Sequence, residues 1–237
     1  MKKYRIVFGF LCISAFLVAG IAGASTLEEG EKLLAEGFRT FQKEPLVKAR
    51  AIFEEKLKEK ENDFKVLYLL ARSLNGLAYV EELNGNKEAA LNLVEEAVKY
   101  GEDSVNYEGN FSDSHRVLAT LYGRLIALKG GSSGAIYAPM NEQQFQEALG
   151  LDPKNAKAYL ELGIARAFTP PQWGGDIDEG IQAMEKAISI DPDFDMAYYY
   201  LGRSLLMKKD KAGAKEILQK GLKVNPHNAF IKKALEE

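Results

Sequence analysis

The sequence is poor in the residues that most often carry enzyme chemistry. Its 237 residues include one cysteine, two histidines and one tryptophan. Cys12 lies in an N-terminal segment that we expect to be removed, and a chain without cysteine has no disulfide and no thiol chemistry. His115 and His227 are far apart in the sequence and stand in no metal-binding or nucleophile-activating pattern. We therefore expect no catalytic site, no metal site and no cofactor, and we expect His115 to pack inside a helix pair.

The chain also lacks an excess of one charge and any strand-like alternation of polar and apolar residues. It has 31 basic and 34 acidic residues, which gives a formal net charge of −3. Such a balance offers no general attraction to nucleic acid. A hydrophobic content of 46% is enough to form a buried core. These features favour a folded, all-α protein that does not bind nucleic acid.

The first 24 residues differ from the rest of the chain. Residues 1–5 carry three positive charges, residues 6–21 are apolar, and Ala22–Ala24 forms an A-x-A cleavage pattern. This order predicts a secretory signal peptide that is cut after this pattern. The product would be an extracytoplasmic (periplasmic or secreted) domain over residues 25–237, with a net charge of −3 − 3 = −6. The alternative is a membrane anchor over residues 6–24, but the apolar run is a little short for the roughly 20 residues that span a bilayer.

The stretch Asp195–Pro226 holds the clearest pattern in the chain. Small and apolar residues recur there at helical spacing in two runs, which are separated at Asp210, a good helix N-cap. Counted from Asp195 as position 1, the pattern has Tyr198 at 4, Leu201 at 7, Gly202 at 8, Leu205 at 11, Ala214 at 20, Leu218 at 24, Gly221 at 27 and Pro226 at 32. It resembles the tetratricopeptide repeat, a 34-residue unit of two helices that needs small residues where the helices nearly touch.

Similar units precede this one. Helices are predicted to end at Asp152-Pro153, Asp191-Pro192 and Asn225-Pro226, which are 39 and then 34 residues apart. A single unit cannot bury its apolar face alone, so the units must stack. We therefore expect a right-handed all-α superhelix of about five helix pairs and a capping helix. The predicted pairs span residues 26–60, 63–100, 112–150, 155–190 and 195–224, and the predicted cap spans residues 228–237.

Two segments are predicted to depart from the ideal unit. In the second pair, the small residues Ala71 and Ala97 are 26 residues apart, whereas the corresponding residues of the C-terminal pair are 19 apart. We interpret the surplus (26 − 19 = 7) as one additional turn in each helix, followed by a loop over Gly101–Asn110. The glycine- and serine-rich stretch Gly130–Ala138 is predicted to be a flexible break before a helix that starts at Pro139.

In tetratricopeptide-repeat proteins the first helix of each pair lines a concave face, and the resemblance implies the same here. The corresponding residues include six cations against one acid, Asp113, although the mature chain has a negative net charge. Such a surface suits an extended peptide or an anionic group, and the plainer alternative is a polar face in contact with solvent. The predicted groove residues are Lys65, Tyr68, Arg72, Arg116, Arg124, Lys157, Phe168, Tyr199 and Arg203.

Two further features concern the ligand. The carboxylate clamp of chaperone-binding tetratricopeptide-repeat domains is not expected, because Glu161 stands where the clamp would need a polar or cationic group. The insertion Thr169–Gly175 contains Trp173, which we expect to pack against its own helix pair, and the alternative is a lip that faces a ligand or partner. The segments Thr169–Asp176 and Asp113–Leu128 are similar to exported tetratricopeptide-repeat proteins associated with TRAP transporters.

These resemblances imply an exported, non-enzymatic scaffold that binds a protein or peptide in its concave groove. Arginines would attract the partner and aromatic residues would anchor it. The alternative is an extracytoplasmic component that binds a small, anionic ligand for a transporter. Contact with a membrane is expected only through an unprocessed N-terminal segment. An open groove would favour the scaffold, whereas a closed pocket among Tyr68, Arg116, Phe168 and Arg203 would favour the small-ligand component.

Overall fold

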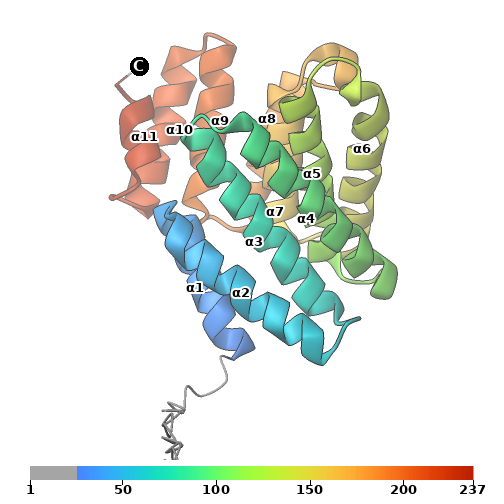
Figure 1. The fold of residues 1–237 in the computed structure, drawn as a ribbon. Helices are drawn as coiled ribbons and strands as arrows, with labels where there is room; N and C mark the ends of the chain where they lie inside the picture. Colours follow the sequence, from blue (N-terminus) through green and yellow to red (C-terminus); the bar gives the residue numbers. More distant parts are fainter. Residues whose placement is uncertain (1–25, 237) are drawn as a thin grey trace, which may run out of the picture.

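A computed structural model describes residues 26–236, and the predicted signal peptide lies outside these residues. The described chain forms eleven α-helices and one short 3-10 helix, without β-strands (Figure 1). The helices are α1 (Leu27–Thr40), α2 (Lys43–Glu59), α3 (Phe64–Leu83), α4 (Lys87–Tyr107), α5 (Ser112–Lys129), α6 (Ser133–Leu151), α7 (Ala156–Phe168), η1 (Pro171–Trp173), α8 (Ile177–Ile190), α9 (Asp195–Met207), α10 (Lys211–Val224) and α11 (Ala229–Ala234).

The helices pack as consecutive pairs. α1 packs on α2, α3 on α4, α5 on α6, α7 on α8 and α9 on α10, and the first helices of neighbouring pairs contact one another in turn. The short helix α11 packs on α9 and α10 and covers the last pair. In Figure 1 the stack curves so that the red C-terminal helix lies close to the end of the blue N-terminal helix. The predicted all-α superhelix of five helix pairs and a terminal cap is confirmed.

Side-chain caps and small residues explain where the helices begin and how they meet. Asp63 and Asp210 each accept a hydrogen bond from a backbone N–H in the first turn of the helix that follows, at 3.1 Å and 2.9 Å. α7 and α8 approach each other at Gly163 and Gly180. An added Cβ on either glycine would lie within 2.8 Å of a backbone oxygen of the opposite helix. Small residues are therefore required at this crossing, as the repeat pattern predicts.

The second pair is longer than predicted. α3 and α4 have 20 and 21 residues, against 13 and 14 in α9 and α10, so each gains seven residues (20 − 13 and 21 − 14). This gain corresponds to about two turns rather than one. The predicted loop Gly101–Asn110 is wrong, because α4 continues to Tyr107. Gly101 is buried in this helix, where an added Cβ would lie 3.2 Å from a side-chain carbon of Leu118. It is a residue of close packing rather than a helix breaker.

The predicted break before α6 is also shorter than expected. Only Gly130 and Gly131 have left-handed backbone conformations, with φ of +62° and +56°, and α6 already begins at Ser133. The small residues that suggested a loop are therefore helical. Pro139 lies inside α6, where it cannot donate a backbone hydrogen bond. Pro139 and Ala135, four residues earlier, both border the cavity described below.

The hydrophobic core is divided along the stack. The largest cluster joins residues of α1 to α5, a second joins α7, α8 and α9, and a third joins α10 and α11. Phe145 and Ala148 of α6 are buried outside these clusters. Within residues 26–236, no helix combines the length and the apolar composition needed to cross a membrane.

Candidate functional site

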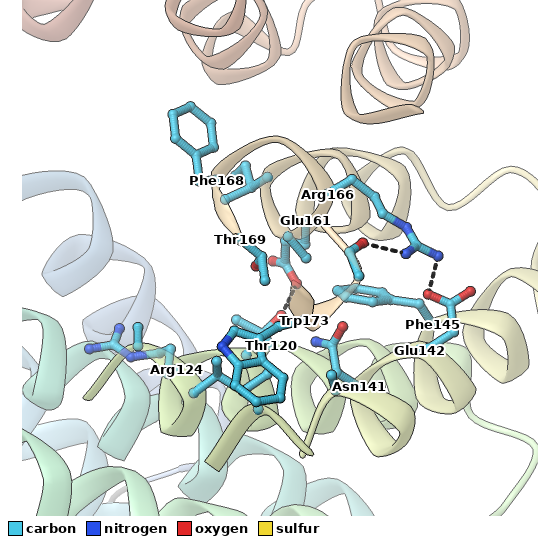
Figure 2. A pocket seen from close by; sticks show the side chains of 18 of the residues that line it. Thr120, Arg124, Asn141, Glu142, Phe145, Glu161, Arg166, Phe168, Thr169 and Trp173 are labelled. Atoms are coloured by element: carbon cyan, nitrogen blue, oxygen red, sulfur yellow. Dashed lines mark hydrogen bonds and ion pairs between the residues drawn. The ribbon is translucent and has the colours of Figure 1, made fainter. Parts of the chain in front are cut away.

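A cavity of about 700 Å³ lies between α5, α6, α7 and the insertion that contains η1 (Figure 2). Most of its surface is carbon, and the rings of Phe145, Phe168 and Trp173 form part of it. Its size falls in the range of roughly 300 to 1,000 Å³ that is typical of small-molecule sites. Much of the remaining wall consists of small residues, namely Gly123, Ala127, Gly134, Ala135, Ala138 and Ala165.

The insertion Thr169–Gly175 closes one side of the cavity. Gly174 has a φ of +86°, and a Cβ on Gly175 would collide with the carbonyl of Thr169, so this turn requires both glycines. The turn places the Trp173 indole against Gly134 at the start of α6, where any Cβ would meet the ring. Trp173 therefore contacts the preceding helix pair and lines the cavity, which favours the alternative of a ligand-facing lip.

The charged side chains at the cavity have partners within the chain. The Glu161 carboxylate accepts hydrogen bonds from the Thr120 hydroxyl at 2.5 Å and from Arg116 Nη1 at 2.6 Å. Arg166 donates to a backbone carbonyl of the insertion at 2.7 Å and forms an ion pair with Glu142 (Figure 2). A strongly charged ligand would have to compete with these contacts. The cavity is therefore better suited to an apolar group.

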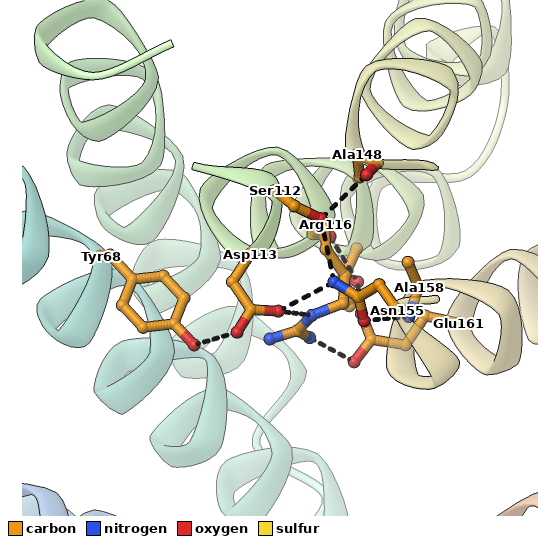
Figure 3. A network of polar contacts seen from close by, with 9 residues as sticks. Tyr68, Ser112, Asp113, Arg116, Ala148, Asn155, Ala158 and Glu161 are labelled. Carbon is orange, nitrogen blue, oxygen red and sulfur yellow. Dashed lines mark hydrogen bonds and ion pairs between the residues drawn. The ribbon is translucent and has the colours of Figure 1, made fainter. Parts of the chain in front are cut away.

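Arg116 lies at the centre of a buried polar network that joins α3, α5 and α7 (Figure 3). Its Nε donates to Asp113 Oδ1 at 2.7 Å, and its Nη1 donates to Glu161. Asp113 also accepts hydrogen bonds from the Tyr68 hydroxyl and the Asn155 amide, each at 3.3 Å. Burial raises the pKa of Asp113, but the Arg116 guanidinium outweighs this effect and holds the pKa below its usual value.

This network gives Arg116 and Tyr68 a role that differs from the predicted one. The sequence predicts both as groove residues that meet a ligand, whereas both side chains are buried, with exposed fractions of 5% and 6%. The charge of Arg116 is matched by the carboxylates of Asp113 and Glu161. Its guanidinium therefore stabilises the junction between helix pairs and is not presented to a partner.

Two other predicted groove cations also form ion pairs within the chain. Lys65 Nζ lies 2.7 Å from Glu31 Oε1. Arg124 Nη2 lies 2.9 Å from Glu82 Oε1, and the Arg124 guanidinium carbon is 5.9 Å from the ring centroid of Tyr79. With Arg116, three of the six cations predicted to attract an anionic partner are therefore neutralised by neighbouring acids.

The other three predicted cations lie in different surroundings. The Arg72 guanidinium stands over two aromatic rings, 5.3 Å from the centroid of Tyr68 and 5.5 Å from that of Phe38. Such cation–π contacts leave part of the guanidinium available to other groups. Lys157 is exposed, and Arg203 is half-buried and has interactions within the chain.

The cavity overlaps little with the predicted groove. Only Arg124 and Phe168 of the nine predicted groove residues line it. Of the four residues expected around a closed pocket, it contains Phe168 alone. Phe145 and Tyr200 also line the cavity and were not predicted. Tyr200 directly follows the predicted Tyr199, so an offset of one position in the helix register would have identified it.

A row of aromatic rings connects the first two helix pairs with the cap and the last pair. From Tyr79 on α3, ring centroids follow one another at 5.3 Å to Phe41, 5.3 Å to Phe230, 5.6 Å to Tyr199 and 5.0 Å to Tyr200. We call these five residues the aromatic row. Its two ends, Tyr79 and Tyr200, both line the cavity. Burial, and then the nearby Tyr79 hydroxyl, raise the pKa of Tyr200 to about 12, so its phenol stays neutral near neutral pH.

The histidine of the third pair has a packing role, as predicted. His115 is buried, and its ring nitrogens lie 2.8 Å from Gln144 Oε1 and 2.9 Å from the Gly109 carbonyl oxygen. Both nitrogens are thus engaged within the chain. Residues 26–236 contain no group of three or more histidine, cysteine or acidic side chains placed to hold a metal ion.

Comparison with known proteins links the C-terminal part of the chain to one family. Residues 174–236 match the family model described as tetratricopeptide repeat. The chain is 27% identical over 81 residues to the mitochondrial import receptor subunit TOM70 of Rattus norvegicus, which covers 34% of this chain and 13% of that protein. It is 28% identical over 151 residues to the Hsp70-Hsp90 organizing protein 2 of Arabidopsis thaliana, which covers 64% of this chain and 24% of that protein. The chain thus spans only a minor part of either relative.

The whole fold also has a counterpart among solved structures. The crystal structure of a thermophilic TPR protein from Thermus thermophilus superposes with a TM-score of 0.69 at 20% sequence identity. The match covers 88% of this chain and 100% of that chain. At this identity the likeness concerns the fold alone. It extends over helix pairs that lie before residues 174–236, where the sequence departs further from the repeat pattern.

Proposed function

We propose, from the tetratricopeptide-repeat match of residues 174–236 and from the fold that the whole described chain shares with such proteins, that this protein is a non-enzymatic scaffold that binds a protein or peptide partner. The names of two relatives, an import receptor subunit and an organizing protein of Hsp70 and Hsp90, support a role in binding other proteins. The binding surface of this chain is the concave side with the cavity next to it.

The observation that carries this proposal is the carbon-lined cavity of about 700 Å³ beside the aromatic row. Because Lys65, Arg116 and Arg124 already have acidic partners, attraction of an anionic partner is weaker than their number suggests. An apolar side chain that enters the cavity would instead be transferred out of water. Complete burial of a leucine or phenylalanine side chain contributes about 1.5–3 kcal/mol to the free energy of binding. We therefore propose that the partner is held by an apolar anchor.

Filling the cavity tests this proposal. Ala138 lines the cavity and Ala89 is exposed on α4 away from it, so Ala138→Trp and Ala89→Trp form a matched pair. The full chain is immobilised, exposed to envelope extract and washed with high salt. We expect the unmodified chain and the Ala89→Trp variant to retain the same protein, and the Ala138→Trp variant to lose it while it keeps its helical circular dichroism.

Two results would count against an apolar anchor. Equal capture by the two tryptophan variants would show that the cavity is not part of the binding site. Release of the partner by high salt would show that charged contacts dominate, because salt screens exposed charges but not buried apolar contacts. The remaining predicted cations, Arg72, Lys157 and Arg203, would then be the residues to substitute.

The cavity also supports a second candidate function, a small-ligand-binding component associated with a transporter. Its volume is that of a small-molecule site, and its wall is mostly carbon, with charged side chains such as Glu142, Glu161 and Arg166 at its border. Trp173 lines it and is the only tryptophan of the chain, so its fluorescence reports on the cavity. A protein-free metabolite fraction that shifts this fluorescence, and that co-purifies with the chain, would favour this candidate. A shift with protein fractions only would favour the scaffold.

We further propose that the protein acts outside the cytoplasm after removal of residues 1–24. The support is the order of charged, apolar and A-x-A segments in the sequence. N-terminal sequencing of the protein from its native cells tests this. A start at Ser25 is expected, whereas an intact N-terminus in the membrane fraction would favour an anchor over residues 6–24.

A further inference from the structure

The first and last parts of the stack meet through side chains. Among the described helices, α11 packs only on α9 and α10, and it makes no helix contact with α1 or α2. Nevertheless the Phe230 ring of α11 stands edge-on to the ring of Phe41, which lies just after α1, with centroids 5.3 Å apart. The concave side is therefore bridged at this point by two phenylalanine rings (compare the ends of the stack in Figure 1).

Phe41 has an unusual backbone. Its φ is +54°, a left-handed conformation that bulky residues rarely adopt, and its N–H bonds the Gly37 carbonyl as the C-cap of α1 at 2.9 Å. Glycine or asparagine would serve this cap with less strain. The ring contacts offer a reason for phenylalanine, because this conformation aims the ring at Tyr79 and Phe230. Strained residues of this kind concentrate at sites with a functional constraint.

The bridge is connected directly to the cavity. Phe41 contacts Tyr79, and Phe230 contacts Tyr199, which in turn contacts Tyr200. Tyr79 and Tyr200 line the cavity from α3 and α9. A movement that separates Phe41 from Phe230 would therefore shift the two walls of the cavity that face the concave side.

We propose that Phe41 and Phe230 form a latch that closes the concave side and controls access to the cavity. This proposal rests on the proposed function, because it concerns the regulation of the same site. One ring pair is a small contact compared with a helix interface, so it can separate while α11 stays packed. The cap keeps its own buried contacts in the open state, through Leu218, Ile231 and Ala234.

Distance measurements on the full chain test the latch. Gln42 and Lys233 are exposed on the two sides of the bridge, so cysteines at these positions can carry spin labels once Cys12→Ser has removed the native thiol. We expect a narrow distance distribution with the latch intact. Phe230→Ala, and independently Phe41→Gly, should broaden it and move it to longer distances. Unchanged distributions in both variants would overturn the latch.

Lys209→Gly is the matched control. Lys209 is the other non-glycine residue with a positive φ, +65°, among residues 26–236. Its replacement relieves the same kind of backbone strain without touching the aromatic row. The Lys209→Gly variant should therefore keep the narrow distribution. Broadening as large as in Phe41→Gly would show that loss of a strained residue, rather than loss of the ring, loosens the stack, and this would contradict the proposal.

Control of access is tested with 1-anilinonaphthalene-8-sulfonate as the probe, followed by energy transfer from Trp173 in stopped flow. We expect association to become several-fold faster in Phe230→Ala and Phe41→Gly, and to stay unchanged in Lys209→Gly. Equal association rates in all variants would overturn control of access by the latch. Absence of energy transfer in every variant would count against the cavity as a binding site, and the distance distributions would then decide the latch alone.

Discussion

The crossing of α7 and α8 and the region around α6 are both rich in small residues, yet they differ in what these residues do. At the crossing, Gly163 and Gly180 let two helix backbones come into contact. In α6, Gly134 is covered by the Trp173 ring, and Ala135 and Ala138 border the cavity. Small residues therefore give close packing where a second backbone approaches, and they leave space where only an insertion covers them. The α7–α8 pair takes part in both arrangements, because its two helices meet at Gly163 and Gly180 while the insertion between them covers the small residues of α6.

The largest effect is expected at the Arg116 network, which joins α7 to α5, the helix on which α6 packs. Arg116→Met keeps the length of the side chain but leaves Asp113 and Glu161 without their cation. Removing one partner from a buried ion pair costs about 3–5 kcal/mol. We expect the free energy of unfolding, measured by urea denaturation, to fall by about this amount. A loss below about 1 kcal/mol would mean that water replaces Arg116 and that the network does not hold α7 and α5 together.

The pH dependence of the same variant sharpens this test. The folded-state pKa of Asp113 lies below its unfolded value, so its contribution to stability is present above about pH 4 and is lost as pH falls through the folded pKa. The unmodified chain should therefore lose stability on acidification below about pH 4. The Arg116→Met variant should lose less over the same range. Parallel curves would show that Arg116 is not the cause of the lowered pKa.

A smaller effect is expected at the crossing of α7 and α8. In Gly180→Ala the new Cβ would lie 2.7 Å from the carbonyl oxygen of Gly163, a backbone atom that cannot move without shifting α7. Overpacking of this kind costs about 1–3 kcal/mol. Thermal and urea denaturation should both show the loss. An unchanged midpoint would mean that the two helices are not in firm contact, and the contrast with α6 would disappear.

The smallest effect, with the opposite sign, is expected in α6. Gly150 is exposed near the end of this helix, and no atom lies within 4 Å of the position of an added Cβ. Because glycine is a poor helix former, Gly150→Ala should stabilise the chain by up to about 0.5–1 kcal/mol. A small rise in the urea midpoint would support the open surroundings of α6. A decrease would indicate that a neighbouring segment packs against this face.

The sequence predicted the fold better than the site, and particular residues show why. Small residues at fixed positions and the Asp-Pro and Asn-Pro endings depend only on local spacing, so the helix pairs could be recognised. Gly101 was misread as a breaker because its packing partner, Leu118, lies in the next helix pair. Arg116 is predicted from the repeat pattern to line the concave face, and its burial could not be foreseen because its acidic partner Glu161 is 45 residues away in another pair.

Trp173 shows the same limit. The Trp173 ring packs against Gly134, which belongs to the preceding helix pair and lies in a stretch whose glycine and serine content predicts a loop. Nothing in the local sequence indicates that these two residues meet. The cavity therefore could not be predicted, because it results from the arrangement of three helices relative to one another rather than from any one motif.

The aromatic row also has a consequence for how such a chain can evolve. Solenoids commonly grow by duplication of a repeat, because each unit contacts only its neighbours. Here Phe41 lies in the first pair, between α1 and α2, and Phe230 belongs to the cap, yet their rings are in contact. A sixth pair inserted between them would carry α11 one unit further along the curve and separate the two rings. The contact therefore ties this protein to its present number of repeats, which an open solenoid would be free to change.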